Sequence, residues 1–429
     1  MAQRRAPLLA FLLVACGPGA GGEGEDANRP TRLVLVTLDT LRYDAFTAET
    51  MPRTRRLAEQ GLVFERFYAA APTTQPTHAT LFTGRHPWEH GVVRNGMVLP
   101  EDLPTLAEEL ASAGWRTEGV VASFPVHRRF GFGRGFAQYA DEFTFERKGM
   151  PESWAGEETE GEHFFSIADS TTAKALAALD RLAGPRQFLW VHYFDAHNPY
   201  GDLEERPVTL HRLRTLSRQA DAPELPELVA RARDLYARDV ARMDAELARL
   251  LERLARDADA IETHVLVTAD HGESFGEDGA FGHDTRLTPE QIHVPTFLLS
   301  PLVQAGRTDE VAGTIDAYAT LRALAGLSPA PQGRDLTRGE ADASALGMKR
   351  HDAGSAPRFF RASRAGLLAG DGELLCVDDL ASAPVPGKEA GDVRALFRRF
   401  AAELERTGAS VLGDEETRRA LDALGYGGE

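Results

Sequence analysis

Three short runs of mainly apolar residues stand out along the chain, and each of them leads into an acidic residue. The runs are Leu33–Leu38, Phe188–Phe194 and Val265–Thr268, and the acids that end them are Asp39, Asp195 and Asp270. Continuous apolar runs of this length are typical of strands that are buried on both faces, as in parallel sheets. Because open parallel sheets bind ligands beyond the carboxyl ends of their strands, we expect these acids at one functional edge.

Helical patterns lie between the apolar runs. The clearest covers Leu235–Leu254, where apolar residues recur at helical spacing among arginines and acids. This pattern predicts an amphipathic helix that covers the sheet. Residues 104–123 predict a helix, a turn and a strand, and residues 314–327 predict a helix that ends at Gly326. The alternation of strands and helices predicts an α/β fold with a mostly parallel central sheet flanked by helices.

The pattern changes near residue 339. A hairpin-like pair of short strands is followed by helical patterns from Val393 to Leu424, which predicts a small C-terminal α+β subdomain over 339–429. The preceding 32–338 then form the main, catalytic domain. A chain of 429 residues with 43 % hydrophobic content is long enough to bury a large core. Its formal charge of -17 argues against nucleic acid as a partner, because binding to phosphates needs clustered Lys and Arg.

The first residues predict a targeting segment. Arg4 and Arg5 precede the apolar stretch PLLAFLLVA, and small residues surround Cys16, as in a signal peptide. The sequence LVAC, at Leu13–Cys16, resembles the bacterial lipoprotein box, in which the cysteine is lipidated. This resemblance implies a signal peptide and lipidation site over 1–16, a flexible tether over 17–31, and a lipid anchor facing the periplasm or the exterior of a bacterial cell envelope. An ordinary signal peptide is the alternative, and the choice between inner and outer membrane stays open.

The strongest chemical signal is the acid-imidazole pair in TADHGE. Asp270 and His271 offer one hard oxygen and one imidazole nitrogen to a divalent cation at the end of a buried strand. A pair of this kind is also common in capped turns. Asp39, at the end of another buried strand, favours the metal site, because two neighbouring carboxylates repel each other unless a cation lies between them.

A threonine lies at the start of a predicted helix in TTQPTHATLFTG. Thr74 precedes Pro76 and the helical pattern, and the N-terminus of a helix favours an oxyanion such as phosphate or sulfate. A threonine hydroxyl is a poor nucleophile, but it loses its proton more easily beside a cation and can then attack the bound group. The alternative is that Thr73, Thr74 and Thr77 are only turn and cap residues.

These segments together resemble the sulfatase family within the alkaline phosphatase superfamily. VLVTLDTLRYD is similar to its first metal-binding strand, TQPTHATLFTG to its nucleophile signature, and TADHGE to its second metal motif. HYFDAHNPY, GHDTRLTPEQIHVPTFLLS and the closing ALGY add further matches in family order, from Arg32 to Tyr426. The resemblance implies an alkaline phosphatase-like fold and a hydrolase that acts on sulfate or phosphate esters of small molecules, glycans or lipids.

The resemblance also implies roles for the residues of the metal site. Asp39, Asp270 and His271 match metal ligands, and Thr74 matches the nucleophile, which also contacts the metal. Thr40 stands where many members have a second metal-binding Asp, and it contributes either a weak oxygen ligand or none. This set suits one Ca²⁺, Mn²⁺ or Zn²⁺ ion, and the sequence does not choose among them.

Further roles follow from the resemblance around the metal site. His78 replaces the arginine of the signature, so that positive charge beside the nucleophile depends on protonation of this histidine. His197 matches a substrate-binding histidine, and His283 falls near a lysine that holds the anion or aids the leaving group. Asp195 either orients His197 or caps a helix. A second cation near Asp195, His197 and His283 stays open.

The threonine itself bears on the reaction. Usual sulfatases convert a Cys or Ser at this position into formylglycine, which Thr74 cannot become. A threonine at this position resembles instead the phosphodiesterases, lipoteichoic-acid synthases and phosphoethanolamine transferases of the superfamily. Because those enzymes pass through a phosphothreonine, the resemblance favours phosphoryl chemistry for this chain. Two alternatives remain: a transferase of a phosphoethanolamine or phosphoglycerol type, and a pseudoenzyme that binds anionic glycans, suggested by Thr40 and His78.

Overall fold

A computed structural model describes most of the chain after the N-terminal segment. The described residues are 29–143, 153–154, 157–158, 164–202, 205–219, 221–277, 279–339, 344–350, 355–370, 375–377, 388–407 and 414–423. The predicted signal peptide, Cys16 and most of the predicted tether lie outside them. Within these described ranges, no helix combines the length and the apolar character needed to span a bilayer.

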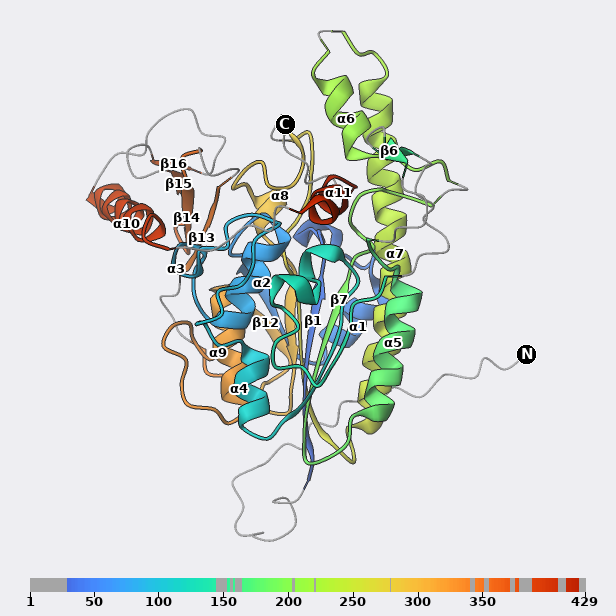
Figure 1. Cartoon of the computed structure of the whole chain (residues 1–429), viewed down its shortest axis with the longest axis vertical. Helices are drawn as coiled ribbons and strands as arrows, with labels where there is room; N and C mark the ends of the chain where they lie inside the picture. Colours follow the sequence, from blue (N-terminus) through green and yellow to red (C-terminus); the bar gives the residue numbers. More distant parts are fainter. Residues whose placement is uncertain are drawn as a thin grey trace.

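The centre of the molecule is an eight-stranded sheet (Figure 1). Its strands, in spatial order, are β12 (Gly306–Gly313), β2 (Leu62–Tyr68), β11 (Thr296–Leu299), β8 (Glu262–Ala269), β1 (Thr31–Leu38), β7 (Arg186–Tyr193), β3 (Arg116–Val120) and β4 (Gln138–Ala140). Only β11 runs antiparallel to its neighbours; all the other pairings are parallel. The predicted mostly parallel sheet is therefore confirmed.

The three predicted apolar strands occupy the middle of this sheet. β1 lies between β8 and β7, and its residues Leu33, Val34, Leu35 and Val36 are fully buried because helices cover both faces. The register aligns Leu38 at the end of β1 with the last residues of both neighbouring strands. The residues that follow the three strands consequently begin at the same level of one sheet edge.

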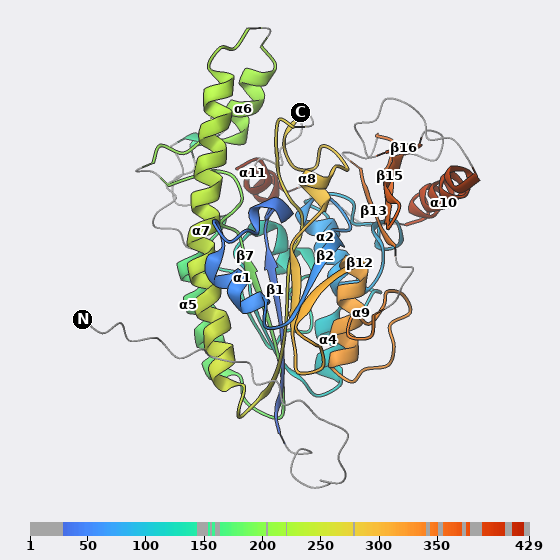
Figure 2. The ribbon, with the colours of Figure 1, turned by 180° about the vertical axis from the view of Figure 1, so that it is seen from behind.

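Two layers of helices enclose the sheet (Figures 1 and 2). One layer holds α1 (Pro52–Ala58), α5 (Ala168–Arg181) and α7 (Leu225–Asp257), and the other holds α2 (Thr74–Thr83), α4 (Leu106–Ser112) and α9 (Thr314–Leu324). The helix predicted over Leu235–Leu254 is longer than expected. Its extra N-terminal part packs against α6 (Leu210–Ser217), and both extend past the sheet in Figure 1.

Short elements complete the main domain. They are η2 (Tyr43–Ala45), α3 (Pro87–His90), η3 (Phe124–Val126), η4 (Arg128–Phe130), β5 (Ser153–Trp154), β6 (Glu157–Glu158), β9 (Ser274–Phe275), β10 (Phe281–Gly282) and α8 (Pro289–Ile292). The pair β9 and β10 forms a small antiparallel hairpin after β8. This hairpin brings the chain that follows β8 back over the functional edge.

The C-terminal part forms the small α+β subdomain that the sequence predicts. Its sheet is antiparallel and contains β13 (Ala345–Lys349), β14 (Arg358–Ser363), β15 (Gly366–Gly370) and β16 (Leu375–Val377), and two helices follow, α10 (Lys388–Leu404) and α11 (Glu415–Ala423). The Phe400 ring of α10 stacks on Trp88 of α3 with ring centroids 3.8 Å apart. This contact joins the subdomain to the loop region after α2.

Candidate active site

Asp39, Asp270 and His271 lie together at one edge of the central sheet. Asp39 follows β1, and Asp270 follows the adjacent β8. The Nε2 atom of His271 lies 3.7 Å from Asp39 Oδ1 and 3.6 Å from Asp270 Oδ2. The structure therefore brings together three of the residues that the sequence assigns to a metal site.

A threonine hydroxyl joins this group. Thr74 is the first residue of α2, it is fully buried, and its Oγ1 lies 3.3 Å from His271 Nε2. Thr73 makes no side-chain cap to the helix, whereas Thr77 Oγ1 donates to the carbonyl of Ala71. Thr77 is thus a turn residue, whereas the hydroxyl of Thr74 lies against the imidazole of His271.

The chemistry of these atoms fits a divalent cation. Both carboxylate oxygens of Asp39 and the Oδ2 of Asp270 are buried and have no hydrogen-bond partner. His271 donates from Nδ1 to the carbonyl of Gly272, so its Nε2 presents a lone pair to the carboxylates. Buried acceptors without donors are costly, and oxygen and imidazole ligands of this kind suit Ca²⁺, Mn²⁺ or Zn²⁺.

The pKa values of the same groups lead to the same conclusion. Burial raises the pKa of Asp39 well above its usual value, and the nearby charge of Glu273 adds to this effect. Burial also raises the pKa of Asp270, with a further contribution from Asp39. Burial lowers the pKa of His271 well below its usual value. A bound cation would stabilise the two carboxylates as anions and the imidazole as a neutral ligand.

Thr40 serves the site mainly through its backbone. Its φ of 53° is in the left-handed region, which is unusual for a β-branched residue. The N–H of Thr40 donates to Asp270 Oδ1 at 3.3 Å, and its carbonyl accepts from the hydroxyl of Tyr236. Asp270 is therefore held by one oxygen while the other faces His271. The Oγ1 of Thr40 is buried without a hydrogen-bond partner, so its predicted role as a weak ligand stays a prediction.

The N-terminus of α2 offers fewer backbone donors than its sequence suggests. The N–H of Gln75 donates to Asn95 Oδ1 at 2.9 Å, and Pro76 has no N–H. The N–H of Thr77 is directed to the carbonyl of Thr73 at 3.4 Å. An oxyanion at Thr74 consequently needs donors from elsewhere in the protein.

Asn95 is the side chain that can supply one, and sequence reasoning missed it. Its Oδ1 is fixed by the N–H of Gln75, and its Nδ2 is buried without a hydrogen-bond partner. An unpaired buried N–H₂ group beside the first turn of α2 is a ready donor for an anion. Asn95 is followed by Gly96, and an Asn-Gly pair is typical of an ordinary turn. Because Asn95 and Gln75 are 20 residues apart in the sequence, no local pattern indicated their contact.

His78 does not place a positive charge beside Thr74. Its Nδ1 donates to the carbonyl of Thr74 at 2.8 Å. Its Nε2 accepts from Thr37 Oγ1 at 3.0 Å, since that hydroxyl already accepts from the indole N–H of Trp190. Burial lowers the pKa of His78 well below its usual value. The side chain is therefore neutral at neutral pH, and it supports the first turn of α2 rather than the charge of the substrate.

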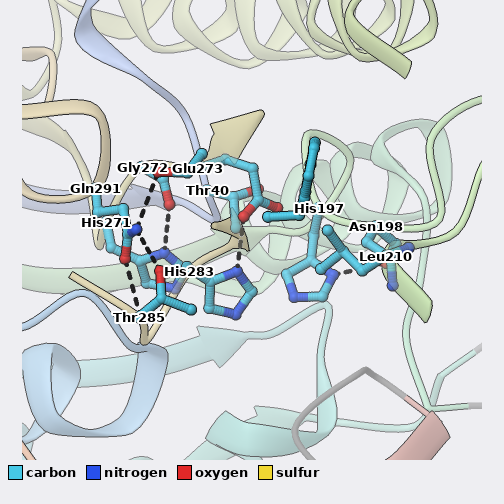
Figure 3. Close-up of polar contacts among 12 residues, drawn as sticks. Thr40, His197, Asn198, Leu210, His271, Gly272, Glu273, His283, Thr285 and Gln291 are labelled. Atoms are coloured by element: carbon cyan, nitrogen blue, oxygen red, sulfur yellow. Dashed lines mark hydrogen bonds and ion pairs between the residues drawn. The ribbon is translucent and has the colours of Figure 1, made fainter. Parts of the chain in front are cut away.

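His197 and His283 lie in a row with His271 (Figure 3). The ring centroids of His271 and His283 are 4.4 Å apart, and those of His283 and His197 are 5.0 Å apart. His197 donates from Nδ1 to the carbonyl of Asn198 at 2.6 Å, so its Nε2 carries the lone pair. Burial, together with the charge of Arg214, lowers the pKa of His283 to about 3. Both imidazoles are thus neutral groups next to the candidate metal site.

Glu273 is a second residue that the sequence analysis did not assign. Its Oε2 accepts from the Tyr200 hydroxyl at 2.8 Å, and its Oε1 lies 3.1 Å from Nδ1 of His283. Burial raises the pKa of Glu273 to about 7. The carboxyl group fixes the orientation of the His283 ring. Its position two residues after His271 was the only available signal.

Asp195 makes a contact that bears on whether it caps a helix or orients His197. Its Oδ1 accepts from the N–H of Ala168, the first residue of α5, at 2.9 Å, which supports the predicted helix-cap role.

Two groups of His, Cys, Asp or Glu residues come close enough to share an ion within the described part of the chain. One is Asp39, Asp270 and His271, and the other is His78, His192 and Asp270. Neither group contains Asp195, His197 or His283, the residues around which the sequence leaves a second cation open.

Comparisons with known proteins show the family to which the chain belongs. Residues 31–327 match the sulfatase family. N-acetylgalactosamine-6-sulfatase from Homo sapiens is 26 % identical over 361 residues, which cover 73 % of this chain. The matched region spans 65 % of the length of that human enzyme.

Solved structures show the same fold at low sequence identity. A phosphonate monoester hydrolase from Silicibacter pomeroyi superposes with a TM-score of 0.66 at 18 % identity, covering 89 % of this chain and 99 % of the hydrolase. A 2-O GAG sulfatase superposes with a TM-score of 0.67 at 15 % identity, covering 91 % of this chain and 96 % of the sulfatase. These likenesses confirm the predicted alkaline phosphatase-like fold.

Proposed function

Because this chain belongs to the sulfatase family, we propose that it is a hydrolase that cleaves a sulfate or phosphate ester with Thr74 as its nucleophile. One observation carries the proposal. Asp39, Asp270 and Thr74 each place an oxygen within 3.3–3.7 Å of His271 Nε2, in a buried group in which both oxygens of Asp39 and Oδ2 of Asp270 lack hydrogen-bond donors. Carboxylates with a purely structural role would normally have hydrogen-bond donors for these three buried oxygens.

A divalent cation held by Asp39, Asp270, His271 and Thr74 would lower the pKa of the threonine hydroxyl and offset negative charge on the ester. The other residues have distinct tasks. Asn95 donates from Nδ2 to a non-bridging oxygen of the ester, and Thr74 supplies the attacking oxygen. His197, whose Nδ1–H is bonded to the Asn198 carbonyl, presents Nε2 as an acceptor for the proton of the water or alcohol that releases Thr74.

Phosphoryl transfer is the favoured chemistry. A formylglycine hydrate can release its sulfate by collapsing to an aldehyde, but an esterified threonine has no such route. Displacement by a second nucleophile in line with the Thr74 oxygen is therefore required, and this is the ordinary course of phosphoryl transfer. Phosphonate monoester hydrolase and sulfatase chemistry both occur on this fold, according to the names of the two superposed structures. We therefore propose phosphate diesters or phosphonate monoesters as the first substrates to test.

The deciding experiment uses purified protein with Mn²⁺ and three aryl esters: a phosphate diester, a phosphonate monoester and a sulfate. We expect turnover of at least one phosphorus ester, and we expect Thr74→Ala to lower kcat/KM by at least about 1,000-fold, since removal of a nucleophile has effects of this size or larger. Thr74→Ser, which keeps the hydroxyl, serves as the matched variant. Mass spectrometry of acid-quenched enzyme should detect phosphate on Thr74. Equal turnover by wild type and Thr74→Ala would exclude Thr74 from the mechanism.

The two alternatives give different results in the same experiment. A transferase would form the Thr74 ester but release it mainly to an added acceptor alcohol, so product would depend on that alcohol. A pseudoenzyme would bind an anionic ester in calorimetry and yield no product. The hydrolase requires product formation with water alone.

We further propose that Cys16 carries a lipid that anchors the protein to a bacterial cell envelope. The support is the sequence Leu13–Cys16 and its place after a short apolar segment. Fractionation of cells that express the full chain should find it in the membrane fraction, and Cys16→Ala should move it to the soluble fraction. An unchanged distribution would refute the anchor.

A further inference from the structure

His192 is a buried imidazole next to the metal site that has no assigned role. It lies near the end of β7, where it pairs in register with Thr37 of β1, and its side chain is fully buried. Its Nε2 lies 3.5 Å from Oδ2 of Asp39 and has no hydrogen-bond partner. The sequence did not predict a role for His192, because it is a single polar residue inside the otherwise apolar run Phe188–Phe194.

The hydrogen-bond partner of the other ring nitrogen determines what Nε2 can do. The backbone N–H of Ala122 points to His192 Nδ1 at 3.4 Å, so Nδ1 is an acceptor. In a neutral imidazole the proton then resides on Nε2. The acceptor beside this nitrogen is Oδ2 of Asp39, 3.5 Å away. A metal ligand would need a lone pair at Nε2, so this tautomer argues against direct coordination by His192.

The two oxygens of Asp39 consequently face different groups. Oδ1 is the oxygen 3.7 Å from His271 Nε2, on the side where the candidate ligands meet, and Oδ2 is the oxygen 3.5 Å from His192. The His192 ring is held in place by edge contacts with His78 and Trp190, at centroid distances of 5.2 Å and 6.4 Å. A fixed ring with an N–H aimed at one oxygen can set the orientation of the carboxylate.

We propose that His192 is a positioning residue for Asp39: its Nε2–H donates to Oδ2, which directs Oδ1 toward the cation shared with Asp270 and His271. This inference rests on the proposed metal-dependent function, but it makes a separate claim about affinity for the cation. Groups that hold a metal-ligating side chain through a hydrogen bond typically change metal affinity by about 10–100-fold when they are removed.

The test measures binding of Mn²⁺ alone to the full chain after removal of metals with a chelator. Calorimetry compares wild type with His192→Phe, which has a ring but no N–H, and with His192→Gln, whose amide N–H reaches about as far as Nε2. We expect the Kd for Mn²⁺ to rise about 10–100-fold in His192→Phe and to return most of the way in His192→Gln. His264→Phe replaces a buried histidine near the opposite end of the sheet on β8, which is separated from β7 by β1, and it should leave the Kd unchanged.

The outcomes separate this inference from the proposed function. A wild-type protein that binds no Mn²⁺ would contradict the metal-dependent function itself. Binding by wild type and equal binding by His192→Phe would overturn only the role of His192. A loss in His192→Gln as large as that in His192→Phe would also overturn donation to Asp39. Melting temperatures in chelator identify any misfolded variant, and His192→Leu replaces His192→Phe if the larger ring is not accommodated.

Discussion

The hydrogen-bond partner of each imidazole determines what that residue can contribute to the site. His271 and His197 both donate from Nδ1 to a backbone carbonyl, so both present a lone pair at Nε2. His192 has the opposite arrangement, because Nδ1 accepts from the N–H of Ala122. His78 has both nitrogens engaged. The four histidines are all buried and neutral, but their ring nitrogens are available in three different ways. The sequence alone does not reveal this difference.

Asn95 gives a prediction for the reaction. Replacement by Ala removes a buried donor beside Thr74, and loss of one preorganised donor to a developing oxyanion typically lowers kcat by about 100–1,000-fold. We expect an effect of this size on kcat against the best aryl phosphorus ester from the substrate test. Steady-state kinetics with wild type and Asn95→Ala measures it.

A matched variant separates donation to the substrate from support of the helix. Asn95→Asp keeps an oxygen acceptor for the N–H of Gln75 but replaces the donor with a second oxygen. It should retain the stability of wild type more closely than Asn95→Ala and still lose activity. Full activity in Asn95→Asp would show that the Nδ2 group does not contact the ester.

At the level of elements, the strands of the site were predictable and several of its contacts were not. The central strands read directly from the sequence, because a strand covered on both faces must be apolar throughout. The convergence of Asp39 and Asp270 followed from the rule that parallel strands end at one edge. Asn95 was hidden because its partner lies in another element, and tertiary contacts of this type leave no local pattern. The N-terminal turns of α7 were missed because they pack against α6, a tertiary contact that the local sequence does not reveal.

The helix that carries Thr74 is fixed at both ends. Asn95 holds its first turn, and Gly84 ends it in the left-handed conformation with φ of 61°. A Cβ added at Gly84 would lie 2.1 Å from Cε1 of the Tyr318 ring on α9. Tyr318 cannot move away easily, because its hydroxyl donates to Glu109 at 3.0 Å. Gly84, the last residue of the segment TQPTHATLFTG, therefore allows α2 to pack closely on α9.

Gly84→Ala should accordingly lower the free energy of unfolding by about 2–4 kcal/mol, the sum of a left-handed backbone cost and an overpacking cost. Gly114→Ala is the matched control, because Gly114 also has a positive φ, of 83°, but nothing lies within 4 Å of the added Cβ. It should cost only about 1 kcal/mol. Urea unfolding of both variants measures the difference. Equal losses would mean that the Tyr318 ring yields without cost.

Across the whole molecule, acid sensitivity should come partly from histidines outside the active site. His86 and His90 lie at α3, the short helix whose Trp88 stacks on the C-terminal subdomain. Burial lowers the pKa of His86 to about 4 and that of His90 to about 3. Both stay neutral in the folded protein at pH values where they become charged in the unfolded chain. Proton uptake by these histidines on unfolding therefore lowers the free energy of unfolding of the protein as pH falls.

The effect can be measured at His90, whose Nδ1 accepts from the N–H of Val92 at 3.0 Å. Between the ordinary pKa of 6.5 and the folded value of about 3, the unfolded state binds more protons, so stability falls as pH decreases. From pH 7 to pH 5 the loss due to His90 is about 2 kcal/mol. His90→Asn keeps an acceptor for Val92 without titrating, so its urea-measured loss over this range should be smaller than that of wild type by this amount. Equal losses in wild type and His90→Asn would contradict a depressed His90 pKa.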